Sequence, residues 1–402
     1  MFKLMESTPG FKYACGWNKF NFDLLGIWPQ QNVNRIKKYR ALINAGSILF
    51  ILTLPRLAAL SLFWGEIDAM IQCFSTHMPF AIGIMKFTIL HFQREVLARF
   101  LQAMEVDWSL VKSEKYFESM IKMARIGRII SIISGSMAHT ANTFGFVVQK
   151  WYNLESYYIQ DPDPRLTMNL FWLVYIPIDT SNTANYICLL SLQFYASCIG
   201  CVIYCCFDSF VVMLVLHLCG QLQCVEISVA EIGTHGSTNS CFRTDLRRIV
   251  QRHESIMRLA GDLEDSFSLV LLLSLIGCTL TFCFEGYALI RLLDRGQLGF
   301  FQLGFSMTVA SGAFLHLFFC CWAGDFLSEQ SMAVGKAIHC SKWYNLSDTE
   351  ARTLMMMGFK AFVPLELTAG KFAALSLNLF VNVVKTSMSY LSVLLACQGS
   401  KV

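Results

Sequence analysis

The sequence predicts an all-α membrane protein with seven transmembrane helices, a cytoplasmic N-terminus and an extracellular C-terminus. Three observations predict this fold class: an apolar composition, seven stretches long enough to cross a bilayer, and a one-sided distribution of basic residues. Of the 402 residues, 55% are hydrophobic and 15% are charged, whereas soluble domains carry about 25% charged residues. The mean hydropathy of +0.49 therefore indicates that lipid surrounds most of the chain.

Seven stretches meet the length requirement of a membrane span. The hydrocarbon core is about 30 Å thick, so a spanning helix needs about 20 mostly apolar residues, and a helix satisfies its own backbone hydrogen bonds locally. The predicted spans are residues 41–63, 67–92, 126–148, 183–220, 266–290, 300–322 and 372–396. The fourth span is longer than a bilayer requires and carries Asp208 and His217 in its second half. We therefore expect it to project into the cytoplasm.

Basic residues orient these spans, because Lys and Arg are retained on the cytoplasmic side of a membrane helix. With the N-terminus inside, most of the 32 Lys and Arg residues fall on the inner side, and several of them crowd residues 35–40, directly before the first span. The loop before the fourth span is acidic and should face outward. Its acidic residues are Glu155, Asp161, Asp163 and Asp179.

The composition also excludes several classes of function. A formal net charge of +4, spread over several loops, is too weak to imply a nucleic-acid partner. Cys198, Cys201, Cys205 and Cys206 are scattered around one helix without a nearby histidine, which favours packing over a metal site. The chain has no phosphate-binding loop, zincin motif or serine elbow, so we expect neither an enzyme nor a cofactor.

Seven helices are typical of G-protein-coupled receptors, but two features argue against that class. The predicted polarity is inverted, since those receptors place the N-terminus outside. The Asp-Arg-Tyr type triplet and the Asn-Pro-x-x-Tyr motif of that family are both missing from the sequence. A secondary transporter is a weaker alternative, because the sequence has no inverted repeat and no paired broken helices.

The last eighty residues carry an ordered set of short motifs. They are WYNLS at 343–347, PL at 364–365, TAGKF at 368–372, LSL at 375–377 and KTSMSY at 385–390. This order resembles the C-terminal signature of insect odorant receptors. Upstream, the Asp208-Ser209 pair and the Leu263-Glu264 pair are also similar to that family, whereas the first 120 residues match mainly by length and hydropathy.

Two branches of the same superfamily fit less well. Gustatory receptors usually end in Thr-Tyr, five apolar residues and Gln-Phe, whereas here Ser389-Tyr390 is followed at that distance by Ala396-Cys397. The shared odorant receptor co-receptor has a long insertion in its fourth loop, and residues 221–265 are too few to contain it. The resemblance therefore points to an odorant-tuning subunit.

The resemblance implies a single membrane domain over residues 1–402 that assembles with the co-receptor into a heterotetramer. Residues 1–40 would form a cytoplasmic arm, 41–325 helices one to six with the ligand pocket, 326–370 a cytoplasmic anchor, and 371–396 a pore-lining helix. The function it implies is that of an odorant-binding subunit. A small volatile organic molecule would open a non-selective pore to cations in the plasma membrane of olfactory sensory neurons. The alternative from another class is a seven-helix receptor coupled to a G protein.

Candidate pore residues follow from position in the seventh span. By its distance from Tyr390, Val393 falls where the family places an apolar constriction, which would gate by dewetting. Lys385 is the one cation deep in that span. It would either face the wider inner vestibule or be held by a neighbouring carboxylate. Ser389 and Leu394 complete the candidate pore and gate set.

The family places the ligand pocket among helices two, three, four and six, in the outer half of the membrane. An apolar cavity with aromatic walls and a few polar groups suits an odorant. The candidate lining residues are Cys73, His77, Phe80, His139, Thr143, Phe146, Tyr186, Leu189, Phe194, Met307, Ser311 and Phe314. Ordinary helix packing is an alternative role for each of them. Asp208 and Glu285, inside predicted spans, are likewise either structural or functional.

Overall fold

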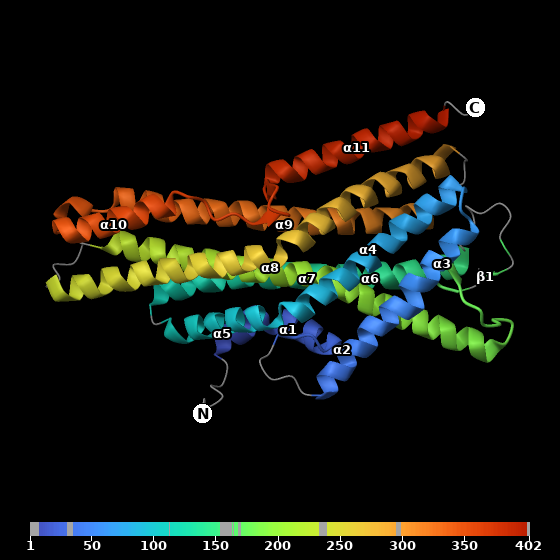
Figure 1. The fold of residues 1–402 in the computed structure, drawn as a ribbon, viewed down its shortest axis with the longest axis horizontal. Coiled ribbons are helices and arrows are strands. Elements are labelled where there is room, and N and C mark those ends of the chain that lie inside the picture. The colour runs from blue at the N-terminus through green and yellow to red at the C-terminus, as the bar shows by residue number, and fades with distance from the viewer. Residues whose placement is uncertain are drawn as a thin grey trace.

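A computed structural model describes residues 8–29, 35–111, 113–152, 163, 165–167, 170–232, 239–294 and 299–399. The described chain is mainly helical, and its long helices run along the longest axis of the molecule (Figure 1). The helical segments are α1 (Pro9–Leu25), α2 (Arg35–Ser47), η1 (Ile48–Thr53), α3 (Leu54–Leu62), α4 (Ile67–Phe92), α5 (Arg94–Leu110), α6 (Glu114–Tyr152), α7 (Thr183–Glu231), α8 (Asn239–Asp294), α9 (Phe300–Cys340), η3 (Trp343–Asn345), α10 (Asp348–Ala361) and α11 (Leu377–Gly399).

Two short antiparallel ribbons accompany the helices. Strand β1 (Leu166–Thr167) pairs with β2 (Val174–Tyr175), so that Leu166 lies opposite Tyr175. Strand β3 (Thr368–Ala369) pairs with β4 (Ala373–Ala374), which places Thr368 opposite Ala374. The first ribbon precedes α7, and the second leads into α11.

Each predicted span overlaps a helical segment, and helices α6 to α9 extend beyond the apolar stretches. The start of the seventh span was wrong, because α11 begins only at Leu377, and the apolar residues before it belong to the ribbon that contains β4. The first span runs through α2, η1 and α3 without a break, and its middle is a π-helix that ends at Thr53, two residues before Pro55. Proline removes one backbone donor from a helix, and a π segment is one way to rearrange the hydrogen bonds around such a site. Hydropathy marks only the part of a helix that lies in lipid, so it underestimates the lengths of α6 to α9.

Helix α7 is the central column of the bundle. It is apolar on all sides, and nearly every residue from Cys206 to Leu222 is buried. A helix of this kind is stable only when other helices surround it. Helices α6, α9 and α4 make its most extensive contacts. With 49 residues, α7 is about 74 Å long at 1.5 Å per residue, more than twice the thickness of a bilayer core.

Within the described residues, five helical stretches are long and apolar enough to cross a membrane. They are Arg35–Leu62, Ile67–Phe92, Thr183–Glu231, Arg243–Arg291 and Leu303–Cys340. Helices α6 and α11 correspond to the other two predicted spans but carry more polar residues, such as Ser131 and Asn382.

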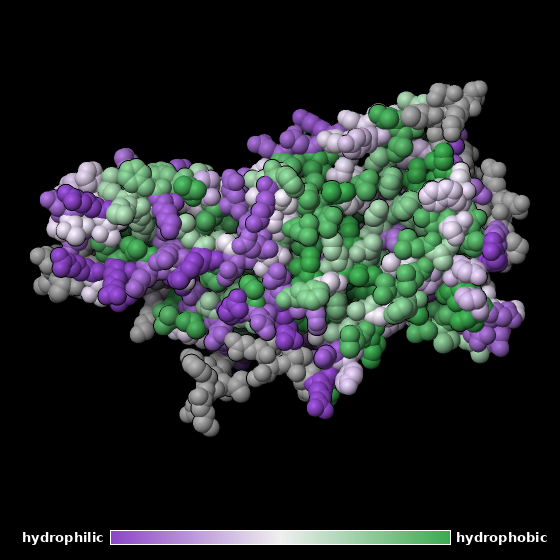
Figure 2. Space-filling view, viewed as in Figure 1, coloured by the Kyte–Doolittle hydropathy of each residue, from purple (hydrophilic) through white to green (hydrophobic). Residues whose placement is uncertain are grey.

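The surface divides into an apolar half and a polar half. Hydrophobic residues cover the half that carries α3, α4 and α11, whereas hydrophilic residues crowd the opposite end, around α10 (Figure 2). The long helices α7, α8 and α9 run through both halves (Figure 1). This division agrees with the expectation that the fourth span projects out of the bilayer. The loop before the fourth span was expected to be acidic and to face outward, and two of its acidic residues, Glu155 and Asp161, lie outside the described residues.

A buried polar cluster joins three helices in the polar half. Asp107 Oδ2 on α5 accepts a hydrogen bond from His217 Nε2 on α7, at 2.9 Å, and lies 2.6 Å from Arg252 Nη2 on α8. Gln221 Oε1 accepts from Arg252 Nε at 3.1 Å. Burial alone would raise the pKa of the Asp107 carboxyl, but the hydrogen bonds from His217 and Arg252 outweigh it and lower the pKa.

The turn before α11 is fastened to α8. Glu264 Oε2 accepts from the Thr368 backbone N–H at 2.7 Å, and the Ser268 carbonyl accepts from the Gly370 N–H at 2.8 Å. Gly370 has a φ of +65°, and a Cβ there would come within 2.5 Å of the Leu272 side chain, so this position favours glycine. These hydrogen bonds bring the Leu263-Glu264 pair and the TAGKF motif together in space. We call this contact between α8 and residues 368–370 the joint.

Replacing Asp107 with Asn should destabilise the folded protein, because it leaves the buried His217 and the partly exposed Arg252 without their anion. Loss of one partner of such a pair costs about 3 kcal/mol. The lowered pKa means that Asp107 stabilises the fold above its ordinary pKa of 3.8, and that this contribution is lost as the pH falls through the lowered value. Thermal unfolding in detergent from pH 7 to pH 3 should show a gap between the two proteins that narrows only below about pH 4.

The matched control is Asp245→Asn, because Asp245 and Arg248 form an exposed pair at 3.1 Å. Such pairs contribute little, so the melting temperature should hardly change. Equal effects of Asp107→Asn and Asp245→Asn would contradict a stabilising role for the buried cluster.

Candidate ligand cavity

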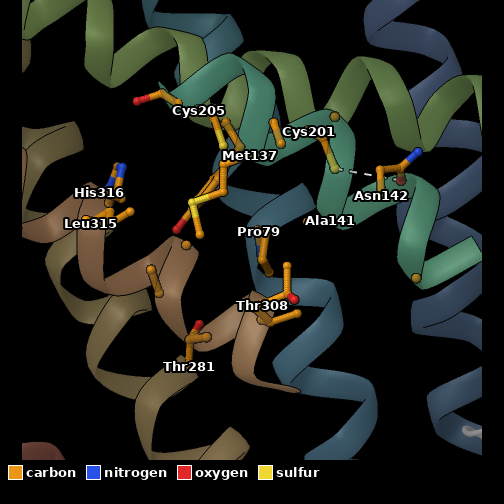
Figure 3. Close-up of a pocket in the computed structure, with 18 of the residues that line it drawn as sticks. Pro79, Met137, Ala141, Asn142, Cys201, Cys205, Thr281, Thr308, Leu315 and His316 are labelled. Atoms are coloured by element: carbon orange, nitrogen blue, oxygen red, sulfur yellow. Dashed lines mark hydrogen bonds between the residues drawn. The ribbon is translucent and has the colours of Figure 1, made fainter. Parts of the chain in front are cut away.

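A cavity of about 130 Å³ lies between α4, α6, α7 and α9. In Figure 3 the side chains of Met137 on α6 and Cys205 on α7 face those of Thr308 and His316 on α9 across it. The lining also includes Thr281 of α8 and two residues of the segment before α7. Its members are Thr76, Pro79, Phe80, Ile130, Ile133, Ser134, Met137, Ala138, Ala141, Asn142, Gly145, Phe171, Trp172, Gly200, Cys201, Tyr204, Cys205, Asp208, Ser209, Thr281, Phe305, Thr308, Val309, Gly312, Ala313, Leu315, His316 and Phe319.

Aromatic rings form one wall of the cavity. Phe171 and Trp172 stack with ring centroids 4.5 Å apart, and Phe80 of α4 meets Trp172 edge-on at 5.7 Å. Behind this wall, Phe146 of α6 packs against Phe171 at 5.1 Å and against Phe194 of α7 at 4.9 Å. Such rings offer a large apolar surface with little freedom to rearrange, so this wall is suited to a flat organic molecule.

The inner end of the cavity is charged. Asp208 Oδ2 of α7 lies 2.5 Å from Lys86 Nζ of α4 and 2.6 Å from His316 Nδ1 of α9. Lys86 also donates to the Tyr204 carbonyl at 3.1 Å and lies 4.4 Å from the centre of the Tyr204 ring. The Lys86 side chain is fully buried. A charge in such a place requires a partner, and this pair meets that requirement.

The structure shows the surroundings of Asp208 and Glu285, for which the sequence left both a structural and a functional role open. Asp208 forms a buried ion pair and also lines the cavity. It lies opposite Lys86, which belongs to the second predicted span, and so lies within the helix bundle rather than free in the cytoplasm. Glu285 on α8 is buried too but is not part of the cavity lining.

Asp208, His316 and Cys320 are the one group in the described chain that could hold a metal ion, with ligand atoms within 4.8 Å of one another. The Lys86 ammonium lies 2.5 Å from Oδ2 of the Asp208 carboxylate that a metal would use. A buried cation at that distance opposes a second one. The group is therefore better described as an ion-pair cluster than as a metal centre.

Of the twelve residues predicted to bind the ligand, Phe80 lines the cavity. Phe146 and Phe194 support its aromatic wall. Leu189, Cys73 and His77 are buried in helix packing, and Tyr186 bonds to Lys150. The remaining residues are exposed on α6 and α9, and they are His139, Thr143, Met307, Ser311 and Phe314.

The sequence did not reveal the rotation of the helices about their axes. On α9 the cavity is lined by Thr308, Gly312 and His316, which lie on another face of the helix from Met307, Ser311 and Phe314. Hydropathy is nearly uniform around such helices, so it does not reveal which face points inward. A role in binding for residues outside the lining stays a prediction.

The predicted pore residues lie on one stripe of α11. Lys385, Ser389 and Val393 follow one another at intervals of four residues and are all exposed, whereas Leu394 is half-buried. The described part of the chain places no carboxylate in an ion pair with Lys385. The structure therefore gives no support to a paired lysine, and it leaves this face of α11 open in the single chain.

Sequence reasoning did not single out two members of the charged cluster, Lys86 and His316. Both fall inside predicted spans, residues 67–92 and 300–322. An ionisable residue inside a span is itself a signal, so a search for possible partners of Asp208 could have found both. The aromatic residues Phe171 and Trp172 lie in the segment before the fourth span, where no spanning pattern points to them.

Comparisons with known proteins agree with this architecture. The model of the family described as 7tm Odorant receptor matches residues 66–388. Odorant receptor 13a of Drosophila melanogaster is 25% identical over 201 residues, which are 46% of this chain and 47% of that protein. Odorant receptor 10 of Aedes albopictus is 22% identical over 228 residues, 55% of this chain and 58% of that protein. The chain thus spans about half the length of these curated relatives.

A solved structure extends the likeness to nearly the whole chain. The insect olfactory receptor OR5 from Machilis hrabei, in complex with eugenol, superposes with a TM-score of 0.79 at 16% identity. The match covers 96% of this chain and 99% of that one, which confirms the predicted seven-helix fold. By the family match and this fold, the chain belongs to the insect odorant receptors, a family of receptors and not of enzymes.

Proposed function

We propose that this chain is the odorant-tuning subunit of a ligand-gated, non-selective cation channel. It assembles with the odorant receptor co-receptor in the plasma membrane of olfactory sensory neurons. The observation that carries the proposal is the apolar cavity beside α7, because it lies in a chain of the odorant receptor family. Relatives named odorant receptor coreceptor, such as that of Ooceraea biroi, 24% identical over 166 residues, support a common architecture for the two kinds of subunit.

The size of the cavity limits the ligand. Its volume is about 130 Å³, and an engineered apolar cavity of about 150 Å³ in another protein holds benzene. The lining is largely apolar, with aromatic rings on one side and a charged cluster at the inner end. A compact volatile molecule with one ring, or an aliphatic chain of similar volume, fits these limits.

Helix α9 joins the cavity to α11. One face of α9 lines the cavity with Thr308 and His316, and another face carries Phe314 and Phe318, whose rings meet Phe380 of α11 at 4.9 and 5.7 Å. Displacement of α9 by a ligand is thereby passed to the helix with the exposed stripe of Lys385, Ser389 and Val393. Opening requires only that the ligand bind the open arrangement more tightly than the closed one.

Recordings from excised patches test the proposal against a G-protein-coupled receptor. Cells expressing this chain and its co-receptor should give rapid cation currents when single-ring volatiles are applied, without nucleotide or cytosolic protein. A response that appears only after a soluble transducer is added would overturn the channel function.

Filling the cavity should weaken the response to such volatiles. Ala141 lines the cavity from α6, whereas Thr143 on the same helix is exposed away from it. Ala141→Phe should raise the half-maximal concentration for current activation by at least about tenfold, the loss expected when apolar contacts worth ~1.4 kcal/mol are removed.

Thr143→Phe is the matched comparison, because it adds the same ring outside the cavity. Its dose–response curve should stay close to that of the unmodified channel. The reverse ranking of the two variants would favour the pocket predicted from sequence over the cavity described here.

Val393→Ser should increase the current that flows without ligand, because a hydroxyl in an apolar constriction makes it easier to wet. Val381→Ser provides the control, since Val381 is another exposed valine on α11, twelve residues earlier. Unchanged ligand-free current in Val393→Ser channels of normal surface abundance would place the gate elsewhere.

A further inference from the structure

The carboxylate at the inner end of the cavity has unused hydrogen-bonding capacity. Asp208 Oδ2 takes the contacts with both Lys86 and His316. Asp208 Oδ1 is buried and has no hydrogen-bond partner among the residues that the structure describes, although Asp208 belongs to the cavity lining. A buried acceptor without a donor is costly. A ligand that offers a donor at this end of the cavity would remove that cost.

Other hydroxyl groups of the lining already donate their hydrogens to acceptors within the protein. The hydroxyls of Thr281 and Thr308 donate to carbonyls of their own helices, at 2.9 and 2.7 Å. The Ser209 hydroxyl lies 3.1 Å from both the Cys206 carbonyl and Asn18 Oδ1. These groups retain lone pairs, so towards a ligand they act as acceptors. The cavity therefore favours ligands that bring a donor.

The aromatic wall contains an exception, the indole N–H of Trp172, which is buried without a partner among the described residues. It can donate to an alcohol oxygen or to an ether oxygen equally well. It therefore does not distinguish a ligand with a donor from an isomer that has only an acceptor. Asp208 Oδ1 does distinguish them.

The charge of the cluster decides between neutral and cationic donors. The fully buried Lys86 ammonium lies 2.5 Å from Asp208, so the pair is neutral as a whole. An ammonium ligand would have to lose its water in an apolar cavity and approach Lys86. A neutral hydroxyl avoids both costs.

We propose that the cavity is selective for small neutral alcohols and phenols, whose hydroxyl donates a hydrogen bond to Asp208 Oδ1. This inference rests on the proposed odorant-binding function and names the ligand class of the same cavity. Asp208 is thereby the residue that determines specificity, and Lys86 and His316 position it.

Three probes with equal numbers of heavy atoms test the inference. Benzyl alcohol carries a donor and an acceptor, its isomer anisole carries only an acceptor, and ethylbenzene carries neither. Competition with radiolabelled benzyl alcohol would measure their affinities on the purified full-length chain with its co-receptor in lipid nanodiscs. Because a hydrogen bond to a charged group is involved, benzyl alcohol should bind at least about tenfold more tightly than anisole.

The double variant Lys86→Met/Asp208→Leu removes the carboxylate and its counter-ion together. Replacement of a buried ion pair by apolar residues of similar size is usually tolerated, so this variant should fold even where Asp208→Asn does not. Its ratio of anisole to benzyl alcohol dissociation constants should fall about tenfold relative to the unmodified chain. Partition of the probes into lipid cancels in this comparison of ratios.

Thr279→Val is the matched control, because it removes a hydroxyl that donates within α8 and lies outside the cavity lining, so it should leave the ratio unchanged. Equal binding of benzyl alcohol and anisole to the unmodified chain, or an unchanged ratio in the double variant, would overturn the inference while the binding of odorants stood. Binding of none of the three probes would overturn both the inference and the proposed function.

Discussion

A lysine and an aspartate meet inside this helix bundle where neither side chain reaches water. The contact between Lys86 and Asp208 joins α4 to α7, and His316 brings α9 to the same oxygen. A charge left alone there would cost several kcal/mol, so the three helices favour the one register in which Lys86 and His316 both reach Asp208 Oδ2. That register defines the inner end of the cavity. We regard the pair as a device that specifies the arrangement of the helices rather than as a source of net stability.

The same register explains how a small cavity affects a distant helix. Helix α9 carries the His316 contact, lines the cavity, and packs through Phe314 and Phe318 against Phe380 of α11. The joint between Glu264 and Thr368, shortly before α11, fastens the start of this helix to α8. Helix α11 is thus held at its base and contacted by α9 in its first turn, while its outward stripe stays uncovered. Movement of α9 would therefore tilt α11 about a fixed point.

The spans, their number and the length of the fourth could be predicted from sequence, because the bilayer imposes a length and a hydropathy on every helix. The rotation of each helix could not, since apolar residues surround α7 and α9 on nearly all sides. Most of the predicted ligand residues therefore lie on helix faces that do not line the cavity, and Phe80 is the member of that set that lines it. The contacts of Asp208 with α4 and α9 could not be predicted either, because they depend on how distant helices pack. Lys86 and Asp208 are 122 residues apart in the sequence, and no local pattern links them.

The central claim is that a small ligand occupies the space between the aromatic wall and the charged cluster. Electron cryo-microscopy of the channel assembled with its co-receptor, with and without the volatile that evokes the largest current, tests this most directly. We predict new density in this chain between Phe80 and His316, in contact with both α6 and α9. Density outside that space, for example against His139 and Thr143 on the lipid-facing side of α6, would contradict the account.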